Sequence, residues 1–535
     1  MNADCARGTS DFTRSKFHSV SDGIDWKTAV GLFVITVLCS IVGATCHSLL
    51  VPGEARHAGI VHDMWAARQY LMPRVEGLPV LDGAPLHYWL SLGFLGLFGA
   101  AEWVLRLPAA ISAALTLVVM ARVWLPWLPA RSTVTLAILF LIQPALALAS
   151  RFASPDMLNI LLLTVSVSAF LQAVARLEQG EPASSWALAA WVATGLLGLG
   201  AGPLASAVPL VIVILWLTLR RRCGLVRALC WWPGPLAVAA LLMPWLYFAD
   251  AQYPGVVAVM VEKQLFSLIG RGREGWMEGY GLYGLLMVGG LLPLATCLYR
   301  CRNPDRLRAA RTPVAGLMAV WLAVLVPLHP LVAMTAVGSV AMITVPLIYF
   351  GVLALGPGPQ GRGGARGGAW LLHAALLGAA VVAAGAPLVA YRASDLPPLA
   401  QTLAKHYRGT TDKVVLLDRF DYELNFYMRS PKLVYVVADW SAAAGSVMPS
   451  WKAELIGSAR FAPDTARRLL LEHDAFMEKL CERRVVNLWV VGSPQAYERH
   501  PILLELDVLG GPHGELLWYL GAGTELAQCA TWSGG

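Results

Sequence analysis

The sequence predicts a polytopic α-helical membrane protein that carries a C-terminal α/β domain. Of its 535 residues, 57% are hydrophobic and only 14% are charged, whereas soluble domains carry roughly 25% charged residues. Apolar runs long enough to cross a bilayer recur between residues 28 and 391. From residue 392 onward, short apolar runs alternate with charged segments. The composition therefore places the chain in the membrane class before any motif is considered.

The N-terminus, residues 1–27, is expected to stay in the cytoplasm. It carries Arg7, Arg14, Lys16 and Lys27. The uncharged run that follows has no small-residue cleavage signal close behind it. An uncleaved signal anchor with its basic end inside is the prediction.

The membrane module is expected to span residues 28–391. A spanning helix needs about 20 mainly apolar residues, so about 11 to 13 transmembrane helices are predicted. The apolar runs lie near 28–50, 103–125, 132–149, 157–176, 185–200, 203–219, 230–248, 279–298, 314–328, 331–354 and 369–391, with 86–99 as an extra candidate.

One orientation satisfies the positive-inside rule throughout the module. When the first helix runs outward, the arginine-rich segments at 219–227 and 299–311 both fall inside. The remaining loops then share the outer, periplasmic face, namely 51–100, 150–156, 249–277 and everything after 392. The first of these, residues 51–100, is the largest loop within the module.

Residues 392–535 are predicted to form a periplasmic α/β domain. Apolar runs typical of short buried strands lie at 413–417, 433–437, 485–491 and 515–520. Between them, the segments 421–430 and 464–484 have helical periodicity.

Composition also excludes several classes of function. The net charge of +7 is explained by basic cytoplasmic loops, and nucleic-acid binding would need a continuous basic face. The nine cysteines form no CxxC and no metal-finger spacing, so a zinc or thiol-redox site is not expected. Cys481 and Cys529 are compatible either with one disulfide or with two free thiols. A secondary transporter would show related halves, and no such internal repeat occurs.

The densest charge follows the first apolar run, in the stretch "LVPGEARHAGIVHDMW" at 50–65. Apolar residues recur there at helical spacing, at Ile60, Met64, Ala67 and Leu71. This pattern predicts an amphipathic helix lying in the membrane interface. Its N-terminal end, where the helix dipole favours an anion, carries charged side chains. Considered alone, these side chains are explained most simply by a solvated ion pair at the start of an interfacial helix.

Four further blocks follow in order: "YLMPRVEGLPVLDGAPLHYWL" at 70–90, "EWVLRLPAAI" at 102–111, "SRFASPDML" at 150–158 and "GLGAGP" at 198–203. In this order and spacing they resemble the dolichyl-phosphate-mannose:protein mannosyltransferases and the lipid A aminoarabinose transferases of the GT-C superfamily (families 39 and 83). The resemblance covers about residues 28–220, and the remainder more loosely. It implies a GT-C fold in the bacterial inner membrane and sugar transfer from a polyprenyl phosphate.

The resemblance also implies roles for individual residues. The positions that match the family pattern are Glu54, Arg56, Asp82, Arg106, Arg151 and Asp156. Glu54, Asp156 and Asp82 are the expected catalytic acids. Asp156 has the strongest case, since an acid at the outer end of a spanning helix is costly without a role; the alternative is a helix start after Pro155.

The chain departs from the family at other positions. Gly53 stands where the family has its leading Asp, and Gly83 and Ala201 stand where it has lysines. His57 and His87 replace usual tyrosines. These departures bear on acid–base chemistry and on the cations that hold a phosphate.

Other cations are expected to hold the donor phosphate and stabilise the departing lipid phosphate. Arginine can grip phosphate with two parallel hydrogen bonds. The expected substrate-binding residues are Arg56, His57, Arg74, His87, Arg151, Lys263, Arg271 and Arg273. The outer loop at 262–275, which supplies the last three of these, is also compatible with a solvated polar connector. The cavity is expected between the first outer loop, the 150–156 loop and the 249–277 loop.

The leading hypothesis is an inverting glycosyltransferase with a polyprenyl, or undecaprenyl, phosphate sugar as donor. A lipid acceptor such as a lipid A phosphate fits the loss at Gly53, because a phosphate is already anionic and needs no base to deprotonate it. The alternative hypothesis is a catalytically silent paralogue that acts as a lipid-binding or assembly partner. The sequence indicates no definite cofactor. Glu54, Asp82 and Asp156 could together hold a divalent cation, but their spacing is not a metal-site signature.

Overall fold

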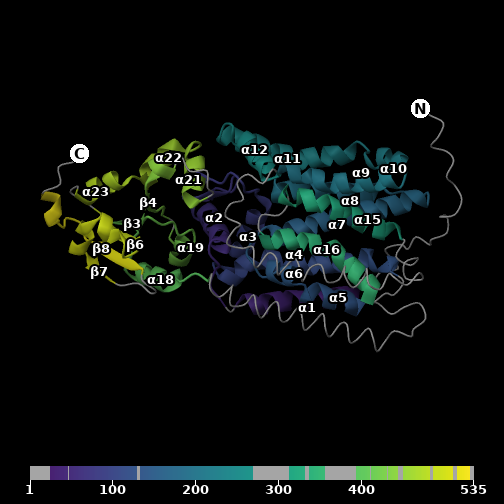
Figure 1. The fold of residues 1–535 in the computed structure, drawn as a ribbon, viewed down its shortest axis with the longest axis horizontal. Coiled ribbons are helices and arrows are strands. Elements are labelled where there is room, and N and C mark those ends of the chain that lie inside the picture. Colours follow the sequence, from purple (N-terminus) through teal and green to yellow (C-terminus); the bar gives the residue numbers. More distant parts are fainter. Residues whose placement is uncertain are drawn as a thin grey trace.

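The computed structural model describes residues 24–45, 47–128, 133–268, 312–331, 336–355, 393–409, 411–430, 432–443, 450–481, 486–509 and 515–530. The molecule is elongated, with the apolar helices bundled at one end and a sheet domain at the other (Figure 1). Helix α2 (Gly53–Ala67) and helix α19 (Leu424–Met428) lie between the two parts.

The bundle consists of helices whose apolar sequences match a lipid environment, where every backbone polar group must be satisfied within its own helix. Five helical segments in the described chain are long and apolar enough to cross a membrane. They are Glu102–Trp127, Asp156–Glu178, Ser184–Ala201, Pro233–Gln252 and Val337–Ala354. This agrees with a polytopic membrane protein. The predicted runs 279–298 and 369–391 lie outside the described residues, so the helix count stays a prediction.

The bundle helices have the following bounds: α1 (Trp26–Ala44), α4 (Glu102–Val123), α5 (Thr133–Ile142), α6 (Pro144–Ala149), α7 (Asp156–Glu178), α8 (Ser184–Ala201), α9 (Ala207–Leu219), α10 (Cys223–Leu229), α11 (Pro233–Gln252), α12 (Val256–Leu268), α15 (Pro313–Leu328) and α16 (Ala336–Leu355). Short 3-10 turns lie at Leu125–Trp127, Pro203–Ser206 and His329–Leu331. In the core, Trp124 meets Trp321 and Tyr349 edge-on.

One predicted helix is wrong as a single element. The run 132–149 is broken into α5 and α6 at Gln143, whose backbone is extended (ψ 116°). Pro144 explains the break, because a proline disfavours helical geometry in the residue before it and lacks an N–H of its own.

Residues 51–100, which the sequence predicts to be the first outer loop, contain α2, a small hairpin of β1 (Arg74–Val75) and β2 (Leu78–Pro79), and α3 (Leu86–Phe98). The prediction of an interfacial amphipathic helix is wrong in two respects. Helix α2 ends at Ala67, so Leu71 lies outside it. Its middle is buried on several sides, and a Cβ on Gly59 would lie 2.2 Å from the Tyr422 carbonyl oxygen. The C-terminal domain therefore packs against α2 at Gly59, and Ile60 and Met64, which we expected to face lipid, are fully buried.

The C-terminal domain is an α/β unit, as predicted. Its six-stranded sheet has the order β5-β4-β3-β6-β8-β7, with β8 and β7 antiparallel to their neighbours. The strands are β3 (Asp412–Leu417), β4 (Tyr435–Val437), β5 (Leu470–Leu471), β6 (Asn487–Gly492), β7 (Asp507–Val508) and β8 (Leu516–Leu520). All four predicted strands are present, and the two that were missed, β5 and β7, are two-residue edge strands.

The domain's helices are α18 (Leu396–His406), α19, α20 (Trp440–Ala443), α21 (Trp451–Ala459), α22 (Pro463–Leu469), α23 (His473–Cys481) and α24 (Ala496–Arg499), with 3-10 turns at Pro501–Glu505 and Ala527–Ala530. The predicted helical segment 464–484 is interrupted, because residues 470–471 pair with β4 as an edge strand. Backbone pairing at the sheet edge thus overrides the local periodicity. Cys481 and Cys529 form a disulfide.

Candidate functional site

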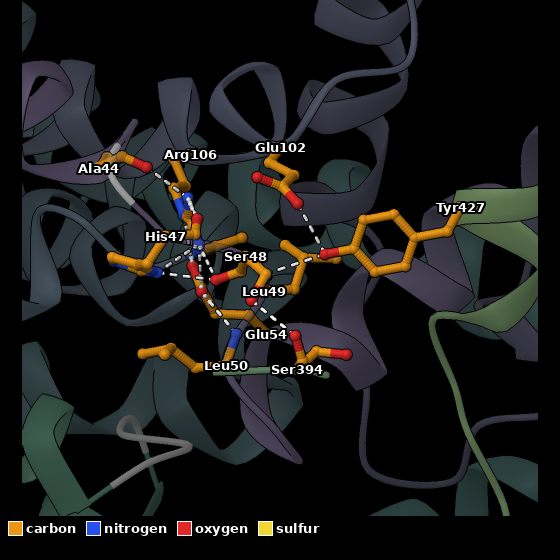
Figure 2. A network of polar contacts seen from close by, with 11 residues as sticks. Ala44, His47, Ser48, Leu49, Leu50, Glu54, Glu102, Arg106, Ser394 and Tyr427 are labelled. Carbon is orange, nitrogen blue, oxygen red and sulfur yellow. Dashed lines mark hydrogen bonds and ion pairs between the residues drawn. The ribbon is translucent and has the colours of Figure 1, made fainter. Parts of the chain in front are cut away.

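Glu54 is buried at the point where the bundle, the first outer loop and the C-terminal domain meet. Its carboxylate forms an ion pair with Arg106, which donates from Nε at 2.8 Å and from Nη2 at 2.6 Å (Figure 2). The backbone N–H groups of Leu50 and Ala153 donate to the same carboxylate, at 3.0 and 2.7 Å. Both carboxylate oxygens are therefore engaged, and α2, α4 and the 150–156 loop are tied together by one side chain.

Arg106 extends this network toward the C-terminal domain. It also donates to the carbonyls of Ala44, His47 and Ser48 at the end of α1. The Ser48 hydroxyl in turn donates to the Ser394 carbonyl at 2.8 Å. Figure 2 shows this chain of contacts running through the segment between α1 and α2.

Tyr427 makes a second link across the same junction. Its hydroxyl donates to Glu102 at 2.6 Å and accepts from the Leu49 N–H at 3.0 Å (Figure 2). Glu54 and Arg106 thus lie at the base of a polar junction that docks the C-terminal domain on the bundle.

Asp156 lies in the first turn of α7, immediately after Pro155, and is 1% exposed. The Ser154 hydroxyl donates to its Oδ2 at 3.4 Å. A Cβ on Gly338 of α16 would lie 2.2 Å from its Cγ, so Asp156 packs directly against that helix. This placement matches the helix-start alternative, and α7 and α16 are held together at that point.

Arg56 lies one helical turn from Gly53 in α2 and joins two acids. Its Nε and Nη2 grip the Glu454 carboxylate of α21, with distances of 2.9 Å from Nε and 2.7 Å from Nη2. Nη2 also contacts Asp82 at 2.5 Å. The Tyr422 hydroxyl donates to the other oxygen of Glu454 at 2.6 Å. Residues 51–100 and the C-terminal domain therefore both contribute to this cluster. We call it the Arg56 cluster, and it consists of Arg56, Asp82, Tyr422 and Glu454.

Lys263 of α12 adds a second cation near this cluster. Neighbouring residues partly desolvate the Asp82 carboxyl, yet the positive charges of Arg56 and Lys263 lower its pKa to about 2. Asp82 is therefore a carboxylate at neutral pH. Its side chain is 52% exposed, whereas those of Arg56 and Glu454 are 19% and 17% exposed.

His57, His87 and Tyr88 pack beneath the Arg56 cluster. His57 Nδ1 lies 3.0 Å from the Tyr88 hydroxyl, and the two histidine rings meet edge-on at 5.7 Å between centroids. Burial, with His87 and Arg56 nearby, holds the pKa of His57 well below its usual value. His87 Nδ1 is buried without a hydrogen-bond partner among the described residues.

Two predicted substrate-binding arginines have other partners. Arg74 pairs with Asp63 at 3.0 Å, and Asp63 also accepts from the Gly77 N–H, so both anchor the hairpin. Arg151 donates to the carbonyls of Ala147 and Cys39, and it thereby fastens α6 to α1. Of the remaining predicted cations, Arg271 and Arg273 lie outside the described residues.

The departures from the family pattern have different surroundings. A Cβ on Gly53 would meet nothing within 4 Å, so a side chain has room there. A Cβ on Gly83 would lie 3.1 Å from Val80 Cγ1 and 3.3 Å from the Tyr88 ring. Beside Ala201, Gln264 of α12 donates to the Ala201 carbonyl at 2.7 Å and accepts from the Leu204 N–H at 3.3 Å. A neutral amide therefore holds the turn that carries a lysine in the family.

An open apolar groove of about 860 Å³ runs between α11 and α12. Leu246, Tyr247, Val257, Val261 and Leu265 contribute apolar surface, and Asp250 and Glu262 contribute charge. Lys263 and Gln264 of α12 are absent from this lining. The groove is therefore lined by one face of α12, whereas Lys263 and Gln264 lie on another face of that helix.

A metal site is not assembled in the part of the chain that the structure describes. No group of three or more His, Cys, Asp or Glu side chains there could hold a metal ion. The three acids considered as possible ligands of a divalent cation lie apart in different surroundings. Glu54 pairs with Arg106, Asp82 pairs with Arg56, and Asp156 packs against Gly338.

Comparison with known proteins supports this architecture. The family model for dolichyl-phosphate-mannose-protein mannosyltransferases matches residues 82–248. The crystal structure of ArnT from Cupriavidus metallidurans bound to undecaprenyl phosphate superimposes with a TM-score of 0.67 at 19% identity, covering 92% of this chain and 98% of that one. The chain has the GT-C fold, and the resemblance to this superfamily is confirmed.

Two other relatives extend the comparison. The undecaprenyl phosphate-α-4-amino-4-deoxy-L-arabinose arabinosyl transferase of Pseudomonas savastanoi pv. phaseolicola is 28% identical over 216 residues, which are 39% of this chain and 39% of that protein. The matched part thus spans about two fifths of the curated relative's length. The apo oligosaccharyltransferase of Archaeoglobus fulgidus superimposes with a TM-score of 0.50 at 12% identity, covering 88% of this chain and 70% of that one.

Sequence patterns did not identify Glu454 or Gln264 as site residues. Glu454 lies 398 positions from the arginine it contacts, and no local motif marks it. Tyr422, in the segment "DYELNFYMRS" at 421–430, was compatible from sequence both with a substrate contact and with a strand–turn–helix core.

Proposed function

We propose that this protein is a glycosyltransferase of the bacterial inner membrane that takes a sugar from a polyprenyl phosphate, most simply undecaprenyl phosphate. The acceptor is a lipid, such as a lipid A phosphate, on the periplasmic face. The observation that carries the proposal is the position of two cations, Arg56 and Lys263, near the half-exposed carboxylate of Asp82. The fold and the named activities of the relatives support it.

The charges suit a phosphate-linked donor. Arg56 supplies a planar guanidinium, and Lys263 supplies a point charge on the opposing helix α12. Cations placed around the bridging phosphate stabilise the negative charge that develops as the lipid phosphate leaves. The groove between α11 and α12 is the proposed path of the polyprenyl chain, since its apolar lining matches a hydrocarbon.

Asp82 is the proposed acid nearest the chemistry. Its carboxylate is exposed and is held at Arg56 by one contact, which an incoming phosphate can replace. A carboxylate freed in this way can orient the acceptor or stabilise positive charge on the sugar ring. Glu54 and Asp156 are proposed to act structurally, because one is bound by Arg106 and the other is packed against Gly338.

A test is the mass of lipid A from a bacterial strain that lacks its own aminoarabinose transferase and expresses this chain. Addition of a sugar to lipid A is expected for the wild type and should be lost with Arg56→Met. Unmodified lipid A, despite normal amounts of the protein in the membrane, would contradict the proposal.

The alternative is a silent paralogue that binds a lipid or assists assembly. Two observations favour it: the open space at Gly53 and the saturated carboxylate of Glu54, which leave no acid pair at the start of α2. In that case undecaprenyl phosphate would bind to the purified protein, and no sugar would reach lipid A.

A further inference from the structure

The C-terminal domain contributes directly to the surroundings of Arg56. Glu454 on α21 binds the Nε and Nη2 edge of the guanidinium, so its carboxylate fixes the plane of that group. Tyr422, also from this domain, donates to Glu454 at 2.6 Å and fixes the carboxylate in turn. A Cβ on Gly59, one turn further along α2, would lie 2.2 Å from the Tyr422 carbonyl oxygen, so the two segments are in direct contact.

The opposite edge of the guanidinium remains available. Nη1 of Arg56 makes no hydrogen bond or ion pair with any residue that the structure describes. A guanidinium has donors on both edges, and a carboxylate on one edge leaves the other free to meet a phosphate oxygen. The two acids around Arg56 differ in exposure, since Asp82 is 52% exposed and Glu454 17%. Asp82 is therefore the counter-ion that an anion can displace, while Glu454 stays in place.

We infer that Glu454 is a positioning residue for the transfer reaction, and that Tyr422 supports it. The inference rests on the proposed function. Through this pair, the C-terminal domain orients Arg56 so that its free edge faces the donor phosphate. A docked C-terminal domain is thus part of the active arrangement and not only a covering layer over α2.

This role predicts a separation between binding and turnover. In Glu454→Gln the negative charge beside Arg56 is lost, so binding of an anionic lipid should be unchanged or tighter. The guanidinium is held less firmly, and small misplacements of a positioning group cost up to about 10²-fold in rate. We expect the turnover number to fall on the order of 10-fold, while Glu454→Asp, which keeps the charge, and Tyr422→Phe fall less.

The experiment uses the full-length protein in nanodiscs. Undecaprenyl monophosphate is the binding probe, and transfer from the undecaprenyl phosphate aminosugar donor to lipid A gives the turnover number. The matched control is Glu76→Gln, the same acid-to-amide substitution at the same domain boundary, where Glu76 accepts from the Val434 N–H and the Asn425 amide without contacting Arg56. The control is expected to keep the wild-type ratio of binding to turnover.

The outcomes are distinct. A turnover defect in Glu454→Gln with retained binding, absent from Glu76→Gln, would support the inference. Wild-type turnover in Glu454→Gln, or parallel losses of binding, turnover and thermal stability matching the control, would overturn it and leave the proposed function standing. A wild-type protein that neither binds the probe nor transfers sugar would overturn the proposed function and the inference with it.

Discussion

Replacing Glu54 separates a structural role from a catalytic one. The side chain is 2% exposed, and its only charged partner within hydrogen-bond distance in the described structure is Arg106, itself 1% exposed. Glu54→Gln leaves that arginine buried without a counter-ion at hydrogen-bond distance. Removing one member of a buried ion pair costs about 3–5 kcal/mol, because the remaining charge is desolvated without compensation. The Leu50 and Ala153 N–H groups also lose an anionic acceptor.

The assay is thermal unfolding of the purified protein in detergent, with transfer measured on the same preparations. Glu54→Gln is expected to lower the melting temperature markedly. The double variant Glu54→Leu/Arg106→Met should recover part of that loss, since a buried pair can often be replaced by apolar residues without cost. Glu102→Gln, at the same junction, is the matched control and should cost only about 1 kcal/mol for a weakened hydrogen bond.

An unchanged melting temperature in Glu54→Gln would refute this structural role. If Glu54→Gln melts at the wild-type temperature and has lost transfer, then the carboxylate acts on the substrate and the ion pair contributes little to folding.

Three further predictions concern the junction and the two parts it joins. Burial, with Asp63 nearby, raises the pKa of Glu76 from 4.5 to about 8. Between these two values the folded protein holds a proton on Glu76 that the unfolded chain has released. The contribution of Glu76 to the free energy of unfolding should therefore decline as pH rises from about 4.5 to 8. The difference in melting temperature between wild type and Glu76→Gln should therefore depend on pH within that window, and a constant difference would contradict the shift. Gly338→Ala would place a Cβ 2.2 Å from the Cγ of Asp156, so a lower yield and a lower melting temperature are expected. Gly53→Ala is the control and should fold normally, because a Cβ at that position would have no atom within 4 Å. The disulfide between Cys481 and Cys529 joins residues that are 48 positions apart. Its reduction should destabilise the C-terminal domain by about 2–4 kcal/mol, which faster hydrogen exchange in β6 and β8 would report. Unchanged exchange would show that the disulfide does not stabilise these strands.

Local sequence patterns predicted the fold class because they act over short distances. Twenty-residue apolar runs specify membrane helices, and short apolar runs predicted all four of the longer strands in the C-terminal sheet. The errors arose where a neighbouring element changed the outcome. Pro144 broke a continuous apolar run, and pairing with β4 turned residues 470–471 into a strand.

Prediction of the site was limited by long-range contacts. The resemblance to the family located Arg56 and Asp82, which the structure brings together. It also located Glu54, but its pairing with Arg106 requires knowledge of how α2 and α4 pack. Glu454 could not be found at all from local pattern, since an isolated acid on a surface helix resembles any other until the C-terminal domain is docked on α2.

The most direct test of the central claim is transfer of sugar by the purified protein in vesicles that contain the undecaprenyl phosphate aminosugar donor and lipid A. The product is followed by mass spectrometry for wild type, Arg56→Met and Lys263→Met. The account predicts sugar-modified lipid A with the wild type and a loss of at least about 10-fold with either variant, since each removes one cation that stabilises the leaving phosphate. Equal product from all three proteins would contradict the assignment of these cations, and no product from any of them would contradict the proposed activity.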